Sequence, residues 1–136
     1  MPVLDASVCV AIFHEDVPGH AAATAWLAAA ILADEPIVAP VLLLAEVAGA
    51  LARAVLDDRF PMAAIELLRS RRLLELFPID EKLAGRAAVL AAALRIRGAD
   101  ALYVALADQL AIPLITFDRQ QLERGGQVVT ARRPSP

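Results

Sequence analysis

Short apolar stretches alternate with helical segments along the whole chain, and this alternation constrains the fold more than any other feature of the sequence. We expect strands near residues 2–5, 37–39, 73–79, 112–117 and 127–131. Strands that are apolar along their length, separated by helices, are typical of a parallel sheet with helices on both faces. The sequence therefore predicts a three-layer α/β/α domain.

The segments between the expected strands carry alanine and leucine at helical spacing, with proline and glycine as breaks. Helices are expected near residues 7–13, 20–32, 41–57, 61–71, 80–95 and 99–111, with a helical turn over 118–124. We find no repeat or linker. The chain is predicted to form one domain over residues 1–131, followed by a frayed tail over residues 132–136.

Hydrophobic residues make up 59% of the chain, yet no apolar run reaches the roughly 18 residues of a membrane span; residues 21–33 come nearest. Asp5 interrupts the apolar N-terminus, so we expect no secretory signal. Cys9 is the only cysteine, which excludes an intrachain disulfide and fits a cytoplasmic protein with a buried, inert thiol. The surplus of apolar residues predicts a permanent partner, either a second copy, another protein, or both.

The charge balance argues against a protein that coats nucleic acid, because 13 basic and 16 acidic residues give a net charge of −3. It does not exclude an enzyme with a local basic rim. Lys82 is the only lysine, so arginine supplies the remaining positive charge. Arginine suits bidentate contacts with phosphate, although this preference also fits a GC-rich genome.

Four acidic residues lie at positions where α/β domains build their sites. Asp5 ends the first expected strand, and Asp118 follows the fourth. Glu46 stands alone in the apolar run 41–52, and Asp100 begins the helix that leads into the fourth strand. Sites in such folds lie at the carboxyl ends of the strands. All four acids can therefore face one crevice if the first and fourth strands are neighbours.

Three of these acids have a simpler explanation as helix caps. Asp5 precedes one expected helix, Asp100 stands at the start of another, and Asp118 has Gln121 three residues further on, the spacing of a capping box. Capping leaves one carboxylate oxygen free, so it is compatible with ligand binding. Glu46 lies in the middle of its helix and has no such explanation, and burying it unpaired would be costly.

Carboxylates crowded into a cleft repel one another, and a divalent cation removes that repulsion. Oxygen ligands favour Mg²⁺ or Mn²⁺, and the sequence has neither a Cys/His cluster for zinc nor a glycine-centred calcium loop. Such an ion orients a water nucleophile and stabilises charge on a phosphate oxygen. An all-acid site of this kind therefore indicates phosphodiester hydrolysis.

Three segments resemble the PIN-domain family, and more narrowly the VapC-type toxins of toxin–antitoxin pairs. They are LDASV (4–8), LLLAEVAGAL (42–51) and GADALYVALADQLAIPLITFDRQQL (98–122). The resemblance extends over essentially the whole chain. It implies a five-stranded parallel sheet and a Mg²⁺- or Mn²⁺-dependent endoribonuclease that uses a metal-oriented water. It also implies a homodimer and a small antitoxin protein as partner.

The resemblance implies catalytic and metal-binding roles for four acids: Asp5, Glu46, Asp100 and Asp118. It places Ser7 and Thr116 along the site, although local backbone bonding explains both hydroxyls equally well. Arg95, Arg97 and Arg119 are candidate RNA contacts because they are close in sequence to the acids.

Other conspicuous residues have structural explanations. We interpret Arg69, Arg71 and Arg72 as a solvated helix end and residues 14–16 as a polar loop. Trp26 and Tyr103 are expected in a core or an interface.

Two alternatives to a toxin nuclease stay open: a PIN-like protein-binding scaffold with little catalysis, and a housekeeping RNA-processing nuclease. A phosphoacceptor receiver domain is disfavoured because Lys82 lies in the wrong element for it. A haloacid-dehalogenase-type phosphatase is disfavoured because Ser7 stands where it needs a second aspartate.

Overall fold

A five-stranded parallel sheet forms the centre of the computed structural model, which describes residues 1–57, 59–70 and 74–136. The strand order is β3-β2-β1-β4-β5, and each neighbouring pair is parallel. The strands are β1 (Val3–Leu4), β2 (Ile37–Pro40), β3 (Leu74–Phe77), β4 (Leu114–Ile115) and β5 (Ala131–Arg132). The predicted α/β fold with a parallel sheet of about five strands is confirmed.

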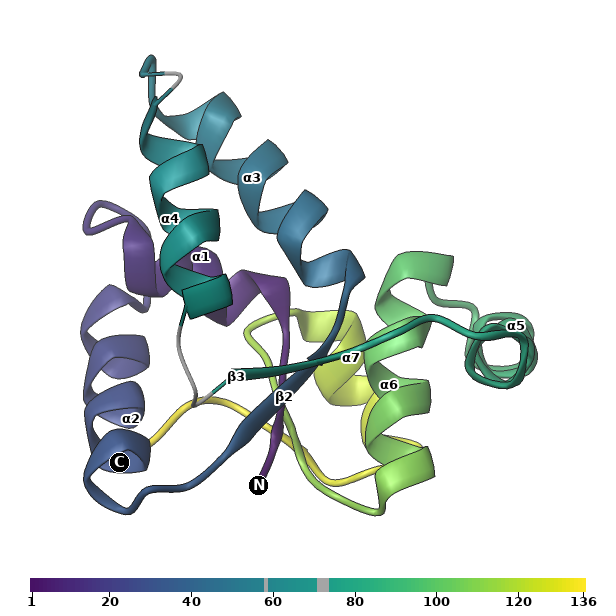
Figure 1. The fold of residues 1–136 in the computed structure, drawn as a ribbon. Helices are drawn as coiled ribbons and strands as arrows, with labels where there is room; N and C mark the ends of the chain where they lie inside the picture. The colour runs from purple at the N-terminus through teal and green to yellow at the C-terminus, as the bar shows by residue number, and fades with distance from the viewer. Residues whose placement is uncertain (58, 71–73) are drawn as a thin grey trace.

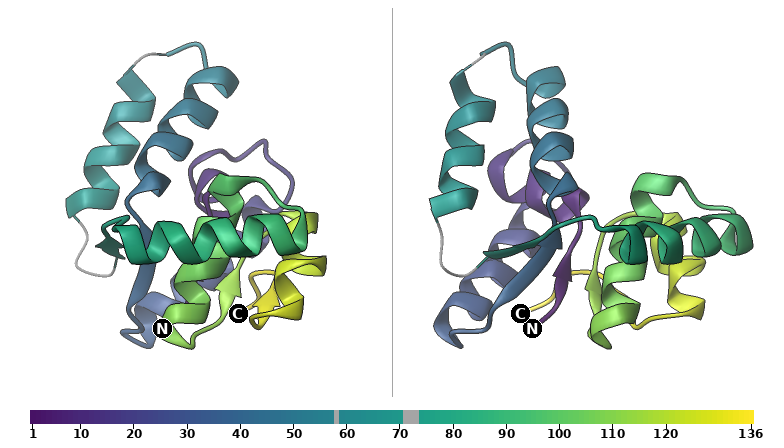
Figure 2. Two further views of the ribbon diagram at one scale, coloured as in Figure 1. Left: turned by 90° about the vertical axis from the view of Figure 1, so that its right-hand side faces the viewer. Right: turned by 45° about the vertical axis from the view of Figure 1, so that its right-hand side comes forward.

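Helices cover both faces of this sheet (Figure 1). They are α1 (Ala6–Phe13), α2 (His20–Leu32), α3 (Leu42–Ala54), α4 (Arg59–Ser70), α5 (Glu81–Leu94), α6 (Gly98–Leu110) and α7 (Arg119–Glu123), with a 3₁₀ turn η1 (Gly125–Gln127). Figure 2 shows α1 to α4 on one side and α5 to α7 on the other, which gives the three predicted layers. In the described residues, no helix is long and apolar enough to cross a bilayer.

The first and fourth strands are neighbours at the centre of the sheet. Val3 of β1 pairs with Val38 of β2 on one side and with Leu114 of β4 on the other. All of these side chains are fully buried. The condition for bringing the four acids together is therefore met, because the ends of β1 and β4 meet at one edge of the sheet.

Helix α3 explains why a largely apolar segment carries a glutamate. Leu43, Val47 and Leu51 recur every four residues and form a fully buried face. Glu46 and Arg53 lie on a different face, which lines a cleft. Helix α4 also packs against α3, and the partly buried Leu44 and Ala48 of α3 pack against the central core.

The core contains the two side chains for which the sequence predicted burial most directly. Trp26 is 6% exposed and packs in the central apolar cluster. Cys9 is fully buried, and burial raises the pKa of its thiol to about 12. The thiol is therefore protonated at neutral pH, as expected for an inert cysteine.

The last predicted strand is wrong in position. Residues 127–131 were expected to be extended, whereas the structure has η1 at its start and β5 at Ala131–Arg132. Gly125 allows this turn to lie against α6, since a Cβ atom there would be 3.0 Å from Val104. Strand β5 crosses the predicted domain boundary at residue 131, and Pro134 beyond it is buried.

Other elements are also shorter than predicted, among them the strand over 112–117 and the helix over 41–57. The strand expected over 112–117 contains only β4, because Ile112 donates its N–H to Ala107 and so closes the end of α6. Helix α3 ends at Ala54 instead of Asp57. The predicted helix end at Arg71, the neighbouring Arg72 and the predicted strand start at Leu73 lie outside the described residues.

Two glycine-to-alanine substitutions should have opposite effects on stability. At Gly19, φ is +94° and a new Cβ would lie 2.6 Å from the Phe117 ring, so we expect Gly19→Ala to destabilise the fold by ~1–3 kcal/mol. At Gly85, within α5, nothing lies within 4 Å, so Gly85→Ala should stabilise it by about 0.5–1 kcal/mol. Urea unfolding measures both changes in the free energy of unfolding. If both substitutions changed it in the same direction, the different surroundings of Gly19 and Gly85 described here would be wrong.

Candidate active site

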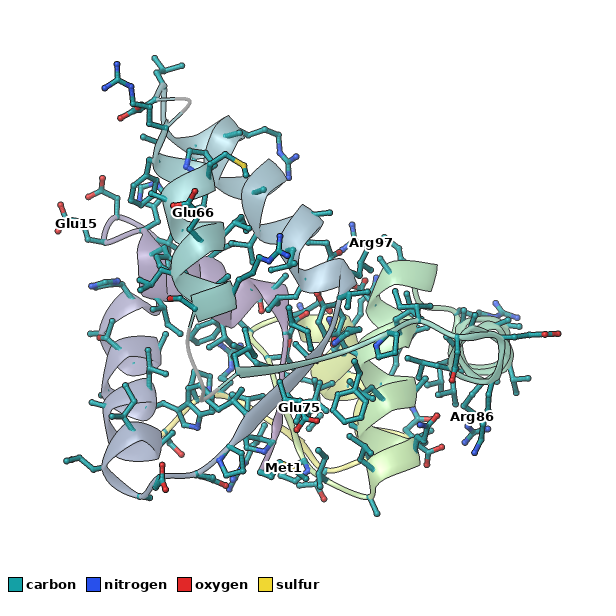
Figure 3. All side chains as sticks on the ribbon, in the orientation of Figure 1. Met1, Glu15, Glu66, Glu75, Arg86 and Arg97 are labelled. Atoms are coloured by element: carbon teal, nitrogen blue, oxygen red, sulfur yellow. The ribbon has the colours of Figure 1, made fainter. Side chains whose placement is uncertain are left out.

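The four predicted acids line one cleft at the carboxyl ends of the strands. Its volume is about 560 Å³. The polar and charged side chains that line it are Asp5, Ser7, Glu46, Arg53, Arg97, Asp100, Asp118 and Gln121. Figure 3 shows Arg97 at the edge where α3 and α6 approach each other. The structure thus brings the acids together as expected, and their role as metal ligands stays a prediction.

Asp5 is the most heavily hydrogen-bonded of these acids. Its Oδ2 accepts hydrogen bonds from the Ser7 N–H at 3.2 Å, from the Ser7 hydroxyl and from the Thr116 hydroxyl at 2.8 Å. Its Oδ1 accepts one from Gln121 Nε2 at 3.0 Å. Asp5 is 3% exposed, so its carboxylate is held rigidly at the floor of the cleft.

The capping explanation is correct for two of the three aspartates. Asp5 is the N-cap of α1, and Asp118 is the N-cap of α7, where it accepts the Gln121 N–H at 2.8 Å. Asp100 is not a cap, because Arg97 occupies the N-cap position of α6 and Asp100 lies in the first turn. Capping engages Oδ1 of Asp118, and in the described residues its Oδ2 accepts no hydrogen bond.

Glu46 is half-buried and is held by a buried tyrosine of α6. The hydroxyl of Tyr103, a fully buried side chain of α6, donates a hydrogen bond to Glu46 Oε2. Burial raises the pKa of Glu46; the Tyr103 hydrogen bond opposes this, and the charges of Asp5 and Asp100 add to it. Tyr103 was expected in a core or an interface, and it lies in the core; its contact with Glu46 was not foreseen.

Arg97 supplies a positive charge beside the acids. Its Nε donates to Asp100 Oδ2 at 3.0 Å, while the guanidinium side chain is 78% exposed. Burial raises the pKa of Asp100, and Arg97 opposes that rise. Only Arg97 is the exposed partner of this ion pair, because the Asp100 side chain is 9% exposed.

The other predicted site residues lie around the cleft in different ways. Thr116 is fully buried beneath Asp5 and does not line the cleft wall. Arg95 and Arg119 lie outside it; Arg119 pairs with Glu123 at 2.9 Å on the surface of α7. Of the three candidate RNA contacts, only Arg97 faces the acids.

Two polar side chains of the cleft were missed by the sequence analysis. Arg53 follows Glu46 by seven residues, or two helical turns, which is a spacing that could have identified it. Gln121 is fully buried and contacts both Asp5 and Asp100. Its spacing from Asp118 was noticed only as a capping signal.

The donor chemistry of the cleft fits a hard divalent cation. All of its charged acceptors are carboxylate oxygens, which Mg²⁺ and Mn²⁺ prefer. In the described residues, however, no three such groups converge closely enough to hold an ion as they stand. Arg97 is paired with one oxygen of Asp100 and Tyr103 with one of Glu46, which leaves the other oxygen of each carboxylate to a cation.

A comparison with protein families matches residues 3–126 to the PIN domain. A comparison with curated protein sequences finds no match.

Solved structures with the same fold include several toxins and toxin–antitoxin complexes. VapC20 of Mycobacterium tuberculosis, a toxin that cleaves the sarcin–ricin loop, is 17% identical with a TM-score of 0.78, over 98% of this chain and 100% of that one. FitAcB of Neisseria gonorrhoeae is 23% identical with a TM-score of 0.75, over 98% of both chains. VapBC2 of Rickettsia felis, bound to promoter DNA, is 16% identical with a TM-score of 0.73, over 96% of both.

Neutralising Glu46 should stabilise the metal-free protein at neutral pH. Because its pKa is raised, the Glu46 carboxyl holds its proton more tightly in the folded than in the unfolded state. Its contribution to folding stability is therefore fully present below the unfolded-state pKa and is lost as the pH rises through the folded-state pKa. We expect Glu46→Gln to raise the melting temperature in EDTA at pH 7.5, because it removes a charge that burial and the neighbouring acids disfavour. Calorimetry at several pH values measures this.

The gain from Glu46→Gln should shrink as the pH falls and vanish well below 4.5, the ordinary pKa of the group, where Glu46 of the wild type is protonated in both states. Glu66→Gln, on the exposed surface of α4, is the matched control and should change little at any pH. A gain of the same size at every pH would show that charge is not its cause.

Proposed function

The chain belongs to the PIN-domain family, and we propose that it is a Mg²⁺- or Mn²⁺-dependent endoribonuclease that acts as the toxin of a toxin–antitoxin pair. The observation that carries this proposal is the cleft at the carboxyl edge of the sheet, which is lined by four carboxylates and two arginines. Carboxylates with a bound divalent cation and a nearby guanidinium are suited to a phosphodiester substrate.

Asp5, Glu46 and Asp100 would hold the cation, with Asp118 nearby. The charges of Asp5 and Asp100 both act on Glu46, and the charges of Asp118 and Asp5 act on Asp100, which places the four acids within electrostatic reach of one another. When bound, the ion supplies positive charge for a phosphate oxygen and lowers the pKa of water. Hydroxyl groups of the protein donate hydrogen bonds to two of the proposed ligands: Thr116 to Asp5, and Tyr103 to Glu46.

Hydrolysis adds water across the bond between phosphorus and O3′ and leaves a 5′-phosphate and a 3′-hydroxyl. Arg97 is placed to bind a phosphate of the RNA, because it is mostly exposed and lies beside Asp100. None of the described residues that line the cleft is a histidine; His14 and His20 line a different hollow. The proposed reaction uses no histidine base.

We further propose a small antitoxin and a second copy of this chain as partners in the cytoplasm. Large apolar side chains are exposed, among them Leu32 at 88% and Met62 at 56%. Such surface is usually covered in a complex. Solved structures of the same fold include a toxin–antitoxin complex from Klebsiella pneumoniae, which supports an antitoxin as one of the partners.

One observation favours the alternative of a protein-binding scaffold with little catalysis. The acids do not converge on a single point in the described residues, so the site is not preformed. The two functions differ in whether the protein binds a divalent cation at all.

A cleavage assay tests the proposed activity directly. Purified protein, freed of any partner, is incubated with total cellular RNA in Mg²⁺, in Mn²⁺ and in EDTA. We expect discrete fragments only with metal, and a decrease of at least about 100-fold in Asp5→Asn, because the metal contributes several kcal/mol of charge stabilisation. Asp108→Asn, on α6 but outside the cleft in an ion pair with Arg86, is the control and should cleave normally.

Two outcomes would contradict the proposed activity. One is cleavage that persists in EDTA or in Asp5→Asn. The other is the absence of both cleavage and calorimetric Mn²⁺ binding in the wild type, which would establish the scaffold instead.

Arg97 and Arg119 provide a matched test of RNA contact. Both are exposed arginines near an acid, but only Arg97 lines the cleft. We expect Arg97→Gln to raise KM for a substrate RNA at least about tenfold, since a charge-assisted hydrogen bond contributes about 1.5–3 kcal/mol. Arg119→Gln should leave KM within about twofold of the wild type. If steady-state kinetics gave the two variants the same KM, a position in the cleft would not be what makes an arginine contact the RNA.

A further inference from the structure

A fully buried glutamine lies among the acids of the cleft. Gln121 belongs to the short helix α7, three residues after Asp118, and its side chain has no exposed surface. Glutamine is normally a surface residue, and its carboxamide needs both donors and acceptors when it is buried. The neighbouring Gln120 is exposed, as is usual for this residue type.

The carboxamide of Gln121 joins two acids that come from different elements. Its Nε2 donates to Oδ1 of Asp5 at 3.0 Å and to Oδ1 of Asp100 at 3.3 Å. Both oxygens therefore lie against the same nitrogen atom. The reverse amide orientation would direct a carbonyl oxygen at two carboxylates, so electrostatics selects the orientation in which nitrogen faces them.

The other end of the same carboxamide is unsatisfied. Gln121 Oε1 is buried and has no hydrogen-bond partner among the described residues. Buried polar atoms are almost always paired, and an exception in a native fold calls for an explanation. An unbranched apolar side chain of the same length would avoid this unpaired acceptor, so the NH₂ group is what the glutamine contributes here.

The atom of Asp5 that Gln121 contacts is also the one that remains available to a ligand. Oδ2 of Asp5 already accepts from the Ser7 N–H, the Ser7 hydroxyl and the Thr116 hydroxyl. Oδ1 accepts only from Gln121 in the described part of the chain, which leaves it acceptor capacity. The same holds for Oδ1 of Asp100, whose other oxygen is paired with Arg97.

We propose that Gln121 is a positioning residue for the divalent cation: its NH₂ group holds Oδ1 of Asp5 and Oδ1 of Asp100 beside each other, so that the cation meets two oriented ligands. This inference rests on the proposed function, which requires the cation. Ligands that are fixed by neighbouring hydrogen bonds bind metal more tightly than free ones, and loss of such a neighbour typically costs about 10–100-fold in affinity.

The test compares Mn²⁺ binding in two adjacent glutamine variants of the full chain. Gln121→Met keeps the length of the side chain and removes both polar atoms, whereas Gln120→Met makes the same change on the exposed surface. By calorimetry, we expect Gln121→Met to weaken Mn²⁺ binding at least about tenfold, and Gln120→Met to match the wild type. The melting temperature in EDTA shows that each variant is folded.

Should Gln121→Met not fold, Gln121→Asn gives the same comparison, because its carboxamide is one methylene too short to bridge both acids. A second measurement is the Mn²⁺ concentration for half-maximal RNA cleavage, which should rise in the Gln121 variants while KM for RNA stays unchanged. A merely structural role would lower the melting temperature and leave the Mn²⁺ affinity of the folded protein as it was.

The outcomes separate this inference from the proposed function. If the wild type binds Mn²⁺ and the folded Gln121 variants bind it equally tightly, the inference is overturned and the proposed function is not. No Mn²⁺ binding by the wild type would overturn the proposed function, and the inference with it.

Discussion

The carboxylate of Asp5 ties the two central strands together at their carboxyl ends, and the cleft depends on this connection. The Asp5 N–H donates to Ile115 of β4, and its side chain accepts from Thr116, the next residue along. The Ser7 hydroxyl accepts the Phe117 N–H at 3.0 Å and so holds the loop that leads to Asp118. Asp5 is therefore part of the fold as well as of the site, and one of its oxygens is fully committed to structure.

Crowding of negative charge is the cost of this arrangement, and three donors offset it in the metal-free chain. Tyr103 donates to Glu46, Gln121 to Asp5 and Asp100, and Arg97 to Asp100. Only Arg97 carries a positive charge among these, and burial still raises the pKa values of Glu46 and Asp100. The cleft thus keeps an unbalanced negative charge, which is the property that attracts a divalent cation.

The sequence identified the acids because each has a local signal. Asp5 and Asp118 follow apolar strands, and Glu46 interrupts an apolar helix. The supporting residues have no such signal, because their partners are remote in the chain. Tyr103 reaches Glu46 across 57 residues, and Gln121 reaches Asp5 across 116. Periodicity correctly placed Tyr103 on a buried face, but it carries no information on which acid its hydroxyl meets.

The arginines show why closeness in sequence is a poor guide to the cleft and why helical phase is a better one. Arg119 follows Asp118 directly, yet its helix directs it to the surface, where it pairs with Glu123. Arg53 is seven residues from Glu46, and two helical turns return it to the same face. A Cβ atom on Gly49 would lie 3.3 Å from Arg53 Nη1, so the guanidinium folds back along α3 toward Glu46. Gly49 thus leaves room for Arg53 along α3, and Glu46 and Arg53 line the same cleft.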